Sequence, residues 1–206
     1  MKIAARTLVV LFCFSVFCIS EPYANSDTSG FTNGAEKFVE SLANNAISSL
    51  TSKKLTEKER QYNFRELLHN YFDINGIGKW ALGRYWRKAS PSERKEYLGL
   101  FENLIVGTYS NRFNAYSNEK LSVKGSTSRG KFALVRSHLN RNNQKPIRVE
   151  WRVTQPDKNY KIFDIVVEGV SMIQTQRSEF SSVIRRNGGN VSGLLSALRK
   201  KLDKSN

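Results

Sequence analysis

Hydrophobic residues recur every three or four positions through the first half of the chain, a period that predicts amphipathic helices. The first of these stripes predicts a helix from about Asn33 to Leu50. Thr56 and Glu59 have the spacing of a capping box, which predicts the start of a second helix. Ser90-Pro91-Ser92-Glu93 combines a hydroxyl cap, a proline and a glutamate in the order that begins a helix, so a long helix is expected there.

From Leu121 onward the hydrophobic period changes towards two, which is typical of strands with one covered face. Polar turn sequences separate the apolar segments, so neighbouring strands are expected to pair antiparallel. Four strands are predicted: one beginning at Leu121, one from Gly130 to Leu139, one containing residues 147–153, and one from Tyr160 to Val167. The last of them is apolar on nearly both faces and is expected to be a central strand and not an edge.

The helical period returns after Gly169, and Asn187-Gly188-Gly189 predicts a stop between two C-terminal helices. This order of elements predicts an α+β fold, with helices stacked on one face of a four-stranded antiparallel sheet. We expect a single domain over residues 25–206, with a helical lobe at about 33–115 and a strand-rich part at about 119–169.

Residues 1–24 have the three-part layout of a secretory signal peptide. Lys2 and Arg6 precede an uncharged run that ends at Ile19 and is too short to span a bilayer. Cleavage is expected after Ala24, with a cut after Ser20 as the alternative. The pattern therefore predicts an exported protein.

Export changes what the cysteines and the charge imply. Cys13 and Cys18 both lie in the removable segment, so the mature protein is expected to have no disulfide, thiolate metal site or cysteine nucleophile. Loss of Lys2, Arg6 and Glu21 changes the formal net charge from +15 to +14. An exported protein with this charge is expected to meet anionic lipid head groups and acidic proteins rather than nucleic acid.

The sequence offers little that points to catalysis. His69 and His138 are far apart in the chain, and neither has a second ligand at metal-binding spacing. Asp164 and Glu168 share a predicted strand face about 13 Å apart, too far for two carboxylates to act on one bond. We expect these two and Asp73 to be held by arginines or backbone amides. Phosphate-binding and nucleophile-elbow motifs are absent, so no enzyme activity, metal or cofactor is predicted.

Several blocks of sequence together resemble the MlaC family, also called toluene-tolerance auxiliary proteins. The resemblance runs from about Ala35 to Leu202 and is strongest in the second half of the chain. The blocks are Gly83-Arg84-Tyr85-Trp86-Arg87, Ser90-Pro91-Ser92-Glu93-Arg94, Ile147-Arg148-Val149-Glu150-Trp151, Phe163 to Met172, Gln176 to Phe180 and Arg185 to Gly189.

This resemblance implies a soluble periplasmic carrier of phospholipid in a Mla-type system. The implied partners are an outer-membrane lipoprotein complex and an inner-membrane ABC transporter with its membrane-anchored binding component. The implied fold has a curved sheet and helices that enclose an apolar cavity for acyl chains. A hopanoid or another hydrophobic ligand is the alternative within the family, and small-molecule catalysis in a helix-on-sheet cavity is the alternative outside it.

Two sets of residues are predicted to serve such a carrier, one lining the cavity and one at its mouth or at a docking surface. For the cavity set the alternative is plain core packing, and for the arginine set it is an ordinary solvated surface. The residues expected to line the cavity are Trp80, Tyr85, Leu104, Tyr109, Trp151, Val153, Phe163, Ile165 and Val167. The residues expected at the cavity mouth or at a partner-docking surface are Arg84, Arg87, Arg148 and Arg152.

Overall fold

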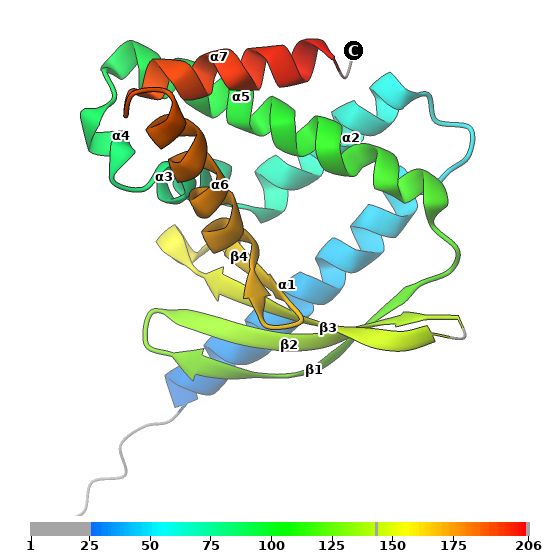
Figure 1. Cartoon of the computed structure of the whole chain (residues 1–206). Helices are drawn as coiled ribbons and strands as arrows, with labels where there is room; N and C mark the ends of the chain where they lie inside the picture. The colour runs from blue at the N-terminus through cyan, green and yellow to red at the C-terminus, as the bar shows by residue number, and fades with distance from the viewer. Residues whose placement is uncertain (1–25, 143, 205–206) are drawn as a thin grey trace, which may run out of the picture.

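The computed structural model describes residues 26–142 and 144–204, and it places a helical layer above an antiparallel sheet (Figure 1). The predicted signal peptide, residues 1–24, lies outside the described residues. The helices are α1 (Ser26–Leu50), α2 (Glu57–Tyr71), α3 (Ile74–Leu82), α4 (Tyr85–Lys88), α5 (Pro91–Tyr109), α6 (Met172–Arg186) and α7 (Val191–Asp203), with short 3-10 helices η1 (Ser110–Ala115) and η2 (Pro156–Lys158). The strands are β1 (Lys120–Arg129), β2 (Phe132–Arg141), β3 (Gln144–Thr154), β4 (Lys161–Val167) and β5 (Val170–Ser171).

The predicted helix starts at the two capping boxes are confirmed. The Thr56 hydroxyl accepts a hydrogen bond from the Glu59 amide, and the Glu59 carboxylate accepts one from the Thr56 amide at 2.8 Å. Ser90 and Glu93 repeat this arrangement at the start of α5, with a proline at the first helical position. The reciprocal bonds satisfy amides that a helix start leaves without partners, which is why these boundaries are readable from sequence.

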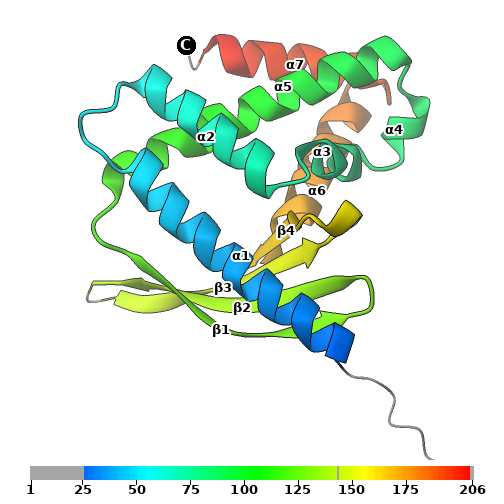
Figure 2. The same cartoon turned by 180° about the vertical axis from the view of Figure 1, so that it is seen from behind.

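Helix α1 begins at Ser26, earlier than the predicted Asn33. A tertiary contact accompanies the extra turns, because the Tyr160 hydroxyl donates to the Phe31 carbonyl at 3.1 Å and the two rings stack 6.0 Å apart. The partner lies more than a hundred residues away in sequence, so helical periodicity cannot reveal it. Figure 2 shows the resulting long helix crossing the sheet.

The sheet has five strands in the order β1-β2-β3-β4-β5, so the prediction of four strands was wrong. Glu168 and Gly169 both have positive φ and form a tight turn, after which β5 pairs with the end of β4. Two residues are too few to show a period, so the sequence pattern could not reveal β5. The strand ending at Val167 is β4, which pairs with β3 on one side and β5 on the other, so the prediction that it is not an edge strand is confirmed, although β3 is the middle strand of the five.

A register shift in the pairing of β3 with β4 decides which residues share a face. Val153 pairs with Ile162, whereas Arg152 pairs with Asp164 and Trp151 with Ile165. One residue of β4, Phe163, is therefore extra, as in a β-bulge. Ile162 and Ile165 thus lie on the same face as Val153 and Trp151, although strict alternation would separate them.

Buried hydrophobic residues form two clusters that meet at Ile105 of α5. The first joins α3, α4, α5, α6 and α7, with Tyr97, Phe101 and Phe180 in mutual ring contact. The second joins α1 and α2 to the sheet, and it includes Val39, Leu68, Val135, Val153 and Ile162. Helices α3 to α7 therefore share one core, and α1 and α2 share another with the sheet.

Candidate functional site

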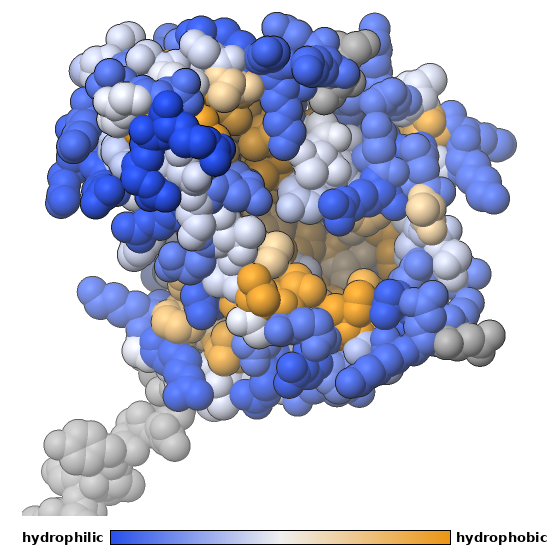
Figure 3. Space-filling model, in the orientation of Figure 1, coloured by the Kyte–Doolittle hydropathy of each residue, from blue (hydrophilic) through white to orange (hydrophobic). Residues whose placement is uncertain are grey.

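The surface is hollowed between α5, α6 and the sheet, and hydrophobic residues are visible inside the hollow (Figure 3). In the same region the second cluster carries hydrophobic side chains that are only half-buried. These side chains come from elements that Figure 1 places around the position of the hollow seen in Figure 3, since the two views share one orientation. They are Ile105 and Tyr109 of the α5 C-terminal end, Phe113 of η1, Leu121 and Val123 of β1, Trp151 of β3 and Ile165 of β4.

The sheet side of this region has one polar anchor. The Trp151 indole donates from Nε1 to the Ser137 hydroxyl at 2.9 Å, and that hydroxyl donates to the Val149 carbonyl at 2.9 Å. Ser137 is 2% exposed, so both donors are satisfied without water. The indole is thereby fixed with its polar edge against the sheet and its hydrocarbon rings left for apolar contact.

Of the nine predicted lining residues, four belong to the cluster of the sheet and α1. Val153 is fully buried in it, and Tyr109, Trp151 and Ile165 are half-buried against it. Val167 is half-buried and pairs with Val149 in the same sheet. The structure thus brings these residues together on one side of the sheet.

The other four predicted lining residues lie elsewhere. Tyr85 and Leu104 are buried in the helical cluster. Phe163 is the extra residue of β4, and its ring packs edge-to-face at 5.4 Å on Phe132, whose neighbour Ala133 points into the core. Phe163 therefore lies on the sheet face opposite Val153. Trp80 is 60% exposed on α3 and is not brought together with the others.

Two of the four predicted docking arginines are ion-paired. The Arg152 guanidinium lies 2.9 Å from the buried Asp164 carboxylate, and that of Arg148 lies 3.5 Å from Glu168. Both arginines alternate with Trp151 along β3, so their side chains leave the sheet on the face opposite the indole. Arg84 precedes α4 and Arg87 lies in it; both are exposed, and neither makes an ion pair with any residue in the described part of the chain.

The prediction that the three carboxylates are held by arginines or backbone amides is confirmed. Asp164 accepts from Arg152, from the Ser171 hydroxyl at 2.6 Å and from the Ile173 amide at 3.1 Å. Asp73 caps α3 by accepting from the Gly76 amide. The Arg148 amide donates to Glu168 at 2.5 Å, and this bond, ahead of the Arg148 charge, holds the pKa of Glu168 below its usual range.

Among the residues that the structure describes, neither histidine belongs to a group that could hold a metal ion. His69 Nε2 lies 3.1 Å from the Glu102 carboxylate on an exposed surface, and His138 is half-buried on β2. Within residues 26–142 and 144–204, no three histidine, cysteine or acidic side chains are grouped in a way that could hold a metal ion.

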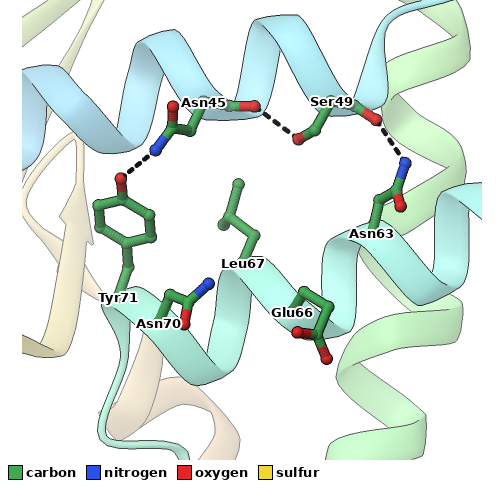
Figure 4. Close-up of a pocket in the computed structure, with 7 residues that line it drawn as sticks. All are labelled: Asn45, Ser49, Asn63, Glu66, Leu67, Asn70 and Tyr71. Carbon is green, nitrogen blue, oxygen red and sulfur yellow. Dashed lines mark hydrogen bonds between the residues drawn. The ribbon is translucent and has the colours of Figure 1, made fainter.

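A small pocket of about 250 Å³ lies between α1 and α2 (Figure 4). All of its lining residues except Leu67 carry polar groups, and several of these are bonded to one another. Asn45 donates to the Tyr71 hydroxyl, and Asn63 donates to the Ser49 carbonyl at 2.9 Å. A pocket so polar is unsuited to hydrocarbon, which favours apolar walls.

Sequence reasoning missed part of the hollow's surroundings. Ser137 occupies an inward position among apolar residues of β2, and a lone hydroxyl in such a place was the available signal for a bonded partner. From the sequence, Ile105 and Phe113 could be recognised only as core positions of a helix. Their exposure to the hollow depends on whether distant parts of the chain cover them.

In the described residues, no helix combines the length and the hydrophobicity needed to cross a membrane.

Comparisons with known proteins agree with this fold. Residues 40–200 match the family model described as "MlaC protein". The chain is 21% identical to the intermembrane phospholipid transport system binding protein MlaC of Haemophilus influenzae, over 87% of this chain and 86% of that protein. It is 25% identical to toluene tolerance protein ttg2D of Pseudomonas putida, over 58% and 56% of the two chains.

Solved structures with a similar fold include one with a bound lipid. It is that of a phospholipid-binding protein from Ralstonia solanacearum in complex with a phospholipid. It superimposes with a TM-score of 0.76 and 21% sequence identity, and the alignment covers 83% of this chain and 98% of that one.

Proposed function

Since the chain belongs to the MlaC family, we propose that it is a periplasmic phospholipid carrier that holds acyl chains in the hollow between α5, α6 and the sheet. The names of two similar proteins, one an intermembrane transport binding protein and one a phospholipid-binding protein, support this proposal. It involves binding and release of lipid but no bond-making, so it needs none of the catalytic groups sought above.

The observation that carries the proposal is the hydrophobic hollow with half-buried apolar residues around it. Exposing two acyl chains of about fifteen methylenes each to water would cost on the order of 20 kcal/mol, at ~0.8 kcal/mol per methylene. A carrier must therefore shelter both chains throughout transit. Tyr109, Trp151, Ile165 and Val167 are the predicted lining residues that we assign to this shelter, together with Ile105, Phe113, Leu121 and Val123.

The head group has the opposite requirement. Its charges are well solvated in water and costly to bury, so it should remain at the opening of the hollow. The proposed route runs between an outer-membrane lipoprotein complex and an inner-membrane ABC transporter with its membrane-anchored binding component. Exposed arginines such as Arg148, whose side chain is 69% exposed, suit brief docking to acidic surfaces of these partners.

The test is organic extraction of protein purified without added lipid, followed by mass spectrometry. We expect about one phospholipid per protein. Ile105→Trp should reduce the bound lipid severalfold, because the larger ring would occupy the hollow while the fold is retained. Val170→Trp is the matched control, since Val170 is 54% exposed on β5 and away from the core clusters.

An empty preparation that also takes no lipid from vesicles would contradict the carrier function. A polycyclic lipid such as a hopanoid in the extract would leave the carrier function standing and change its ligand. Competition between fluorescent phospholipid and hopanoid for the purified protein separates these two outcomes.

A further inference from the structure

Trp80 is one of the few large hydrophobic residues that the described chain leaves exposed, and its position is fixed by the packing of α3. Ile74, Ala81 and Leu82 of that helix are buried in the helical core. A side chain added at Gly78 would meet Leu98 at 2.8 Å, so α3 lies close against α5 on this side. The inner face of the helix is therefore held, and Trp80 on the outer face is 60% exposed to water.

The segment around Trp80 carries positive charge that no acidic residue within it offsets. Between Asp73 and Glu93 it contains Lys79, Arg84, Arg87 and Lys88 and no acidic residue. All four cations are exposed, and none forms an ion pair within the described residues. The flanking carboxylates are engaged elsewhere, because Asp73 caps α3 and Glu93 caps α5. We call Lys79, Trp80, Arg84, Arg87 and Lys88 the basic corner.

Aromatic rings hold part of the basic corner in place. The Arg84 guanidinium lies 5.1 Å from the centre of the Tyr85 ring and donates to the Tyr85 hydroxyl at 3.2 Å. The Lys88 ammonium lies 5.8 Å from the same ring, and that of Lys79 lies 6.0 Å from the Trp86 ring. These cation–π contacts keep the charges together on the surface without neutralising them.

Helix α6 adds two more cations. A side chain at Gly83 would meet the Arg177 guanidinium at 2.6 Å, so this group lies directly against the turn after α3. The hydrogen bond from Arg84 is the main cause that lowers the pKa of the Tyr85 hydroxyl, and the charges of Arg185 and Lys88 act in the same direction. Arg185 therefore lies close enough to contribute to the same positive field. In Figure 3 the strongly hydrophilic surface gathers over this part of the molecule, around α4.

From these positions we infer that the basic corner docks on the surface of an anionic phospholipid bilayer, with the Trp80 indole at the level of the head groups. Unpaired cations attract anionic head groups, and tryptophan prefers the interface between hydrocarbon and water. A protein partner is the less suitable occupant. A stable protein interface buries about 800 Å² on each side around a desolvated apolar centre, whereas the corner offers one exposed indole among charged side chains.

This inference rests on the proposed function, because binding to the surface of a leaflet is useful to a protein that carries phospholipid. Docking on the bilayer does not require the bound acyl chains. The basic corner lies on α3 and α4, whereas the half-buried apolar residues assigned to the lipid lie on α5, η1 and the sheet. Vesicle binding and lipid retention can therefore be measured separately.

The test is co-sedimentation of the full-length mature protein with vesicles of phosphatidylglycerol and phosphatidylcholine, compared with vesicles of phosphatidylcholine alone. At ~1 kcal/mol for each cation near an anionic surface, loss of one cation should weaken binding about fivefold. Arg84→Gln with Arg87→Gln should therefore reduce the vesicle partition coefficient by more than tenfold. Arg129→Gln with Lys131→Gln is the matched control, because these exposed cations lie on the distant β1–β2 turn.

Trp80 gives an independent readout. Binding to anionic vesicles should shift the tryptophan emission to the blue and protect it from acrylamide, and Trp80→Phe should abolish both changes. Tyr62→Ala, which removes an aromatic ring that is 64% exposed on α2, is the control for loss of surface area.

Three results would overturn the inference: equal binding to neutral and anionic vesicles, full binding by the Arg84 and Arg87 variant, or a Trp80 emission unchanged on binding. If that variant bound vesicles normally but lost lipid exchange with the purified transporter component, the corner would serve a protein partner instead. Extracted lipid is measured on the same samples. A preparation that binds vesicles but contains no lipid would count against the carrier function and not against the docking surface.

Discussion

At the scale of single residues, Asp164 joins the sheet to helix α6. It is 3% exposed and receives hydrogen bonds from Arg152 on β3, from Ser171 on β5 and from the first turn of α6. A buried carboxylate is tolerated only when its charge is paired and its oxygens are bonded, and here both conditions are met. The residue therefore has a structural role, connecting β3, β5 and α6.

Asp164→Asn should lower the free energy of unfolding by roughly 2–4 kcal/mol, because it removes the charge that pairs with Arg152 and leaves one acceptor oxygen where the carboxylate has two, so that the new N–H₂ faces either the Arg152 guanidinium or the Ile173 amide, both of which are donors. Urea unfolding followed by circular dichroism measures the change. Asp157→Asn is the matched control, since Asp157 is exposed in η2 and should change stability by no more than about 0.5 kcal/mol. Equal unfolding midpoints for the Asp164 variant and the parent protein would show that this network does not hold α6.

At the scale of elements, the helix starts are set by local chemistry. The Thr56 hydroxyl bond is the main cause that lowers the pKa of Glu59, and the Thr56 amide adds to it. A lowered carboxyl pKa stabilises the folded state at pH values above the ordinary carboxyl pKa of about 4.3. This contribution is lost as the pH falls through the lower pKa of the folded state.

Glu59→Gln should therefore lower the thermal midpoint at pH 7 and have progressively less effect as the pH is reduced from about 5 to 3. The measurement is the difference in melting temperature between parent and variant at each pH. Glu40→Gln on the exposed side of α1 is the control, because Glu40 has no hydrogen bond or ion pair within the described residues. A difference for Glu59 that grew on acidification would have the wrong sign for this capping box.

At the scale of the whole molecule, the charge and the apolar hollow act on different steps. The formal net charge of the full chain is +15, and few of its cations are paired in the described residues. Such a surface speeds encounters with acidic proteins or anionic membranes without requiring deep burial. Retention of acyl chains depends instead on apolar contact, which sodium chloride of ordinary strength does not weaken.

We therefore expect lipid transfer to partner or membrane to slow as sodium chloride is raised, because the Debye length falls to about 8 Å at physiological ionic strength and shortens further with added salt. Lipid retention by the isolated protein should be unchanged over the same range. Transfer of a fluorescent phospholipid, and its loss from the isolated carrier, are the paired measurements. Charge reversal at an arginine that takes part in docking should reproduce the effect of salt. Transfer that did not depend on salt, or lipid shed as salt rose, would exclude electrostatic docking.

The sequence by itself determined the class of fold, the main helix starts and most of the strands. Thr56, Glu59, Ser90 and Glu93 act on amides within one turn of themselves, so their effect is visible from neighbouring residues. The periods of two and of three to four report which face is covered, and the family resemblance follows from blocks within these same segments. The family match confirms that resemblance over residues 40–200.

Only the tertiary structure decided which apolar residues share a face and which remain partly open. The extra residue in β4 places Phe163 on the sheet face opposite to that of Val153, and it puts Ile162 and Ile165 on the same face as each other. Pairing register depends on the partner strand, which local sequence does not show. Trp80 and Trp151 both read as inward positions of amphipathic segments, yet one is 60% exposed on α3 and the other is anchored to Ser137. Exposure is set by what packs against a residue from distant parts of the chain, and a local period contains no information about that.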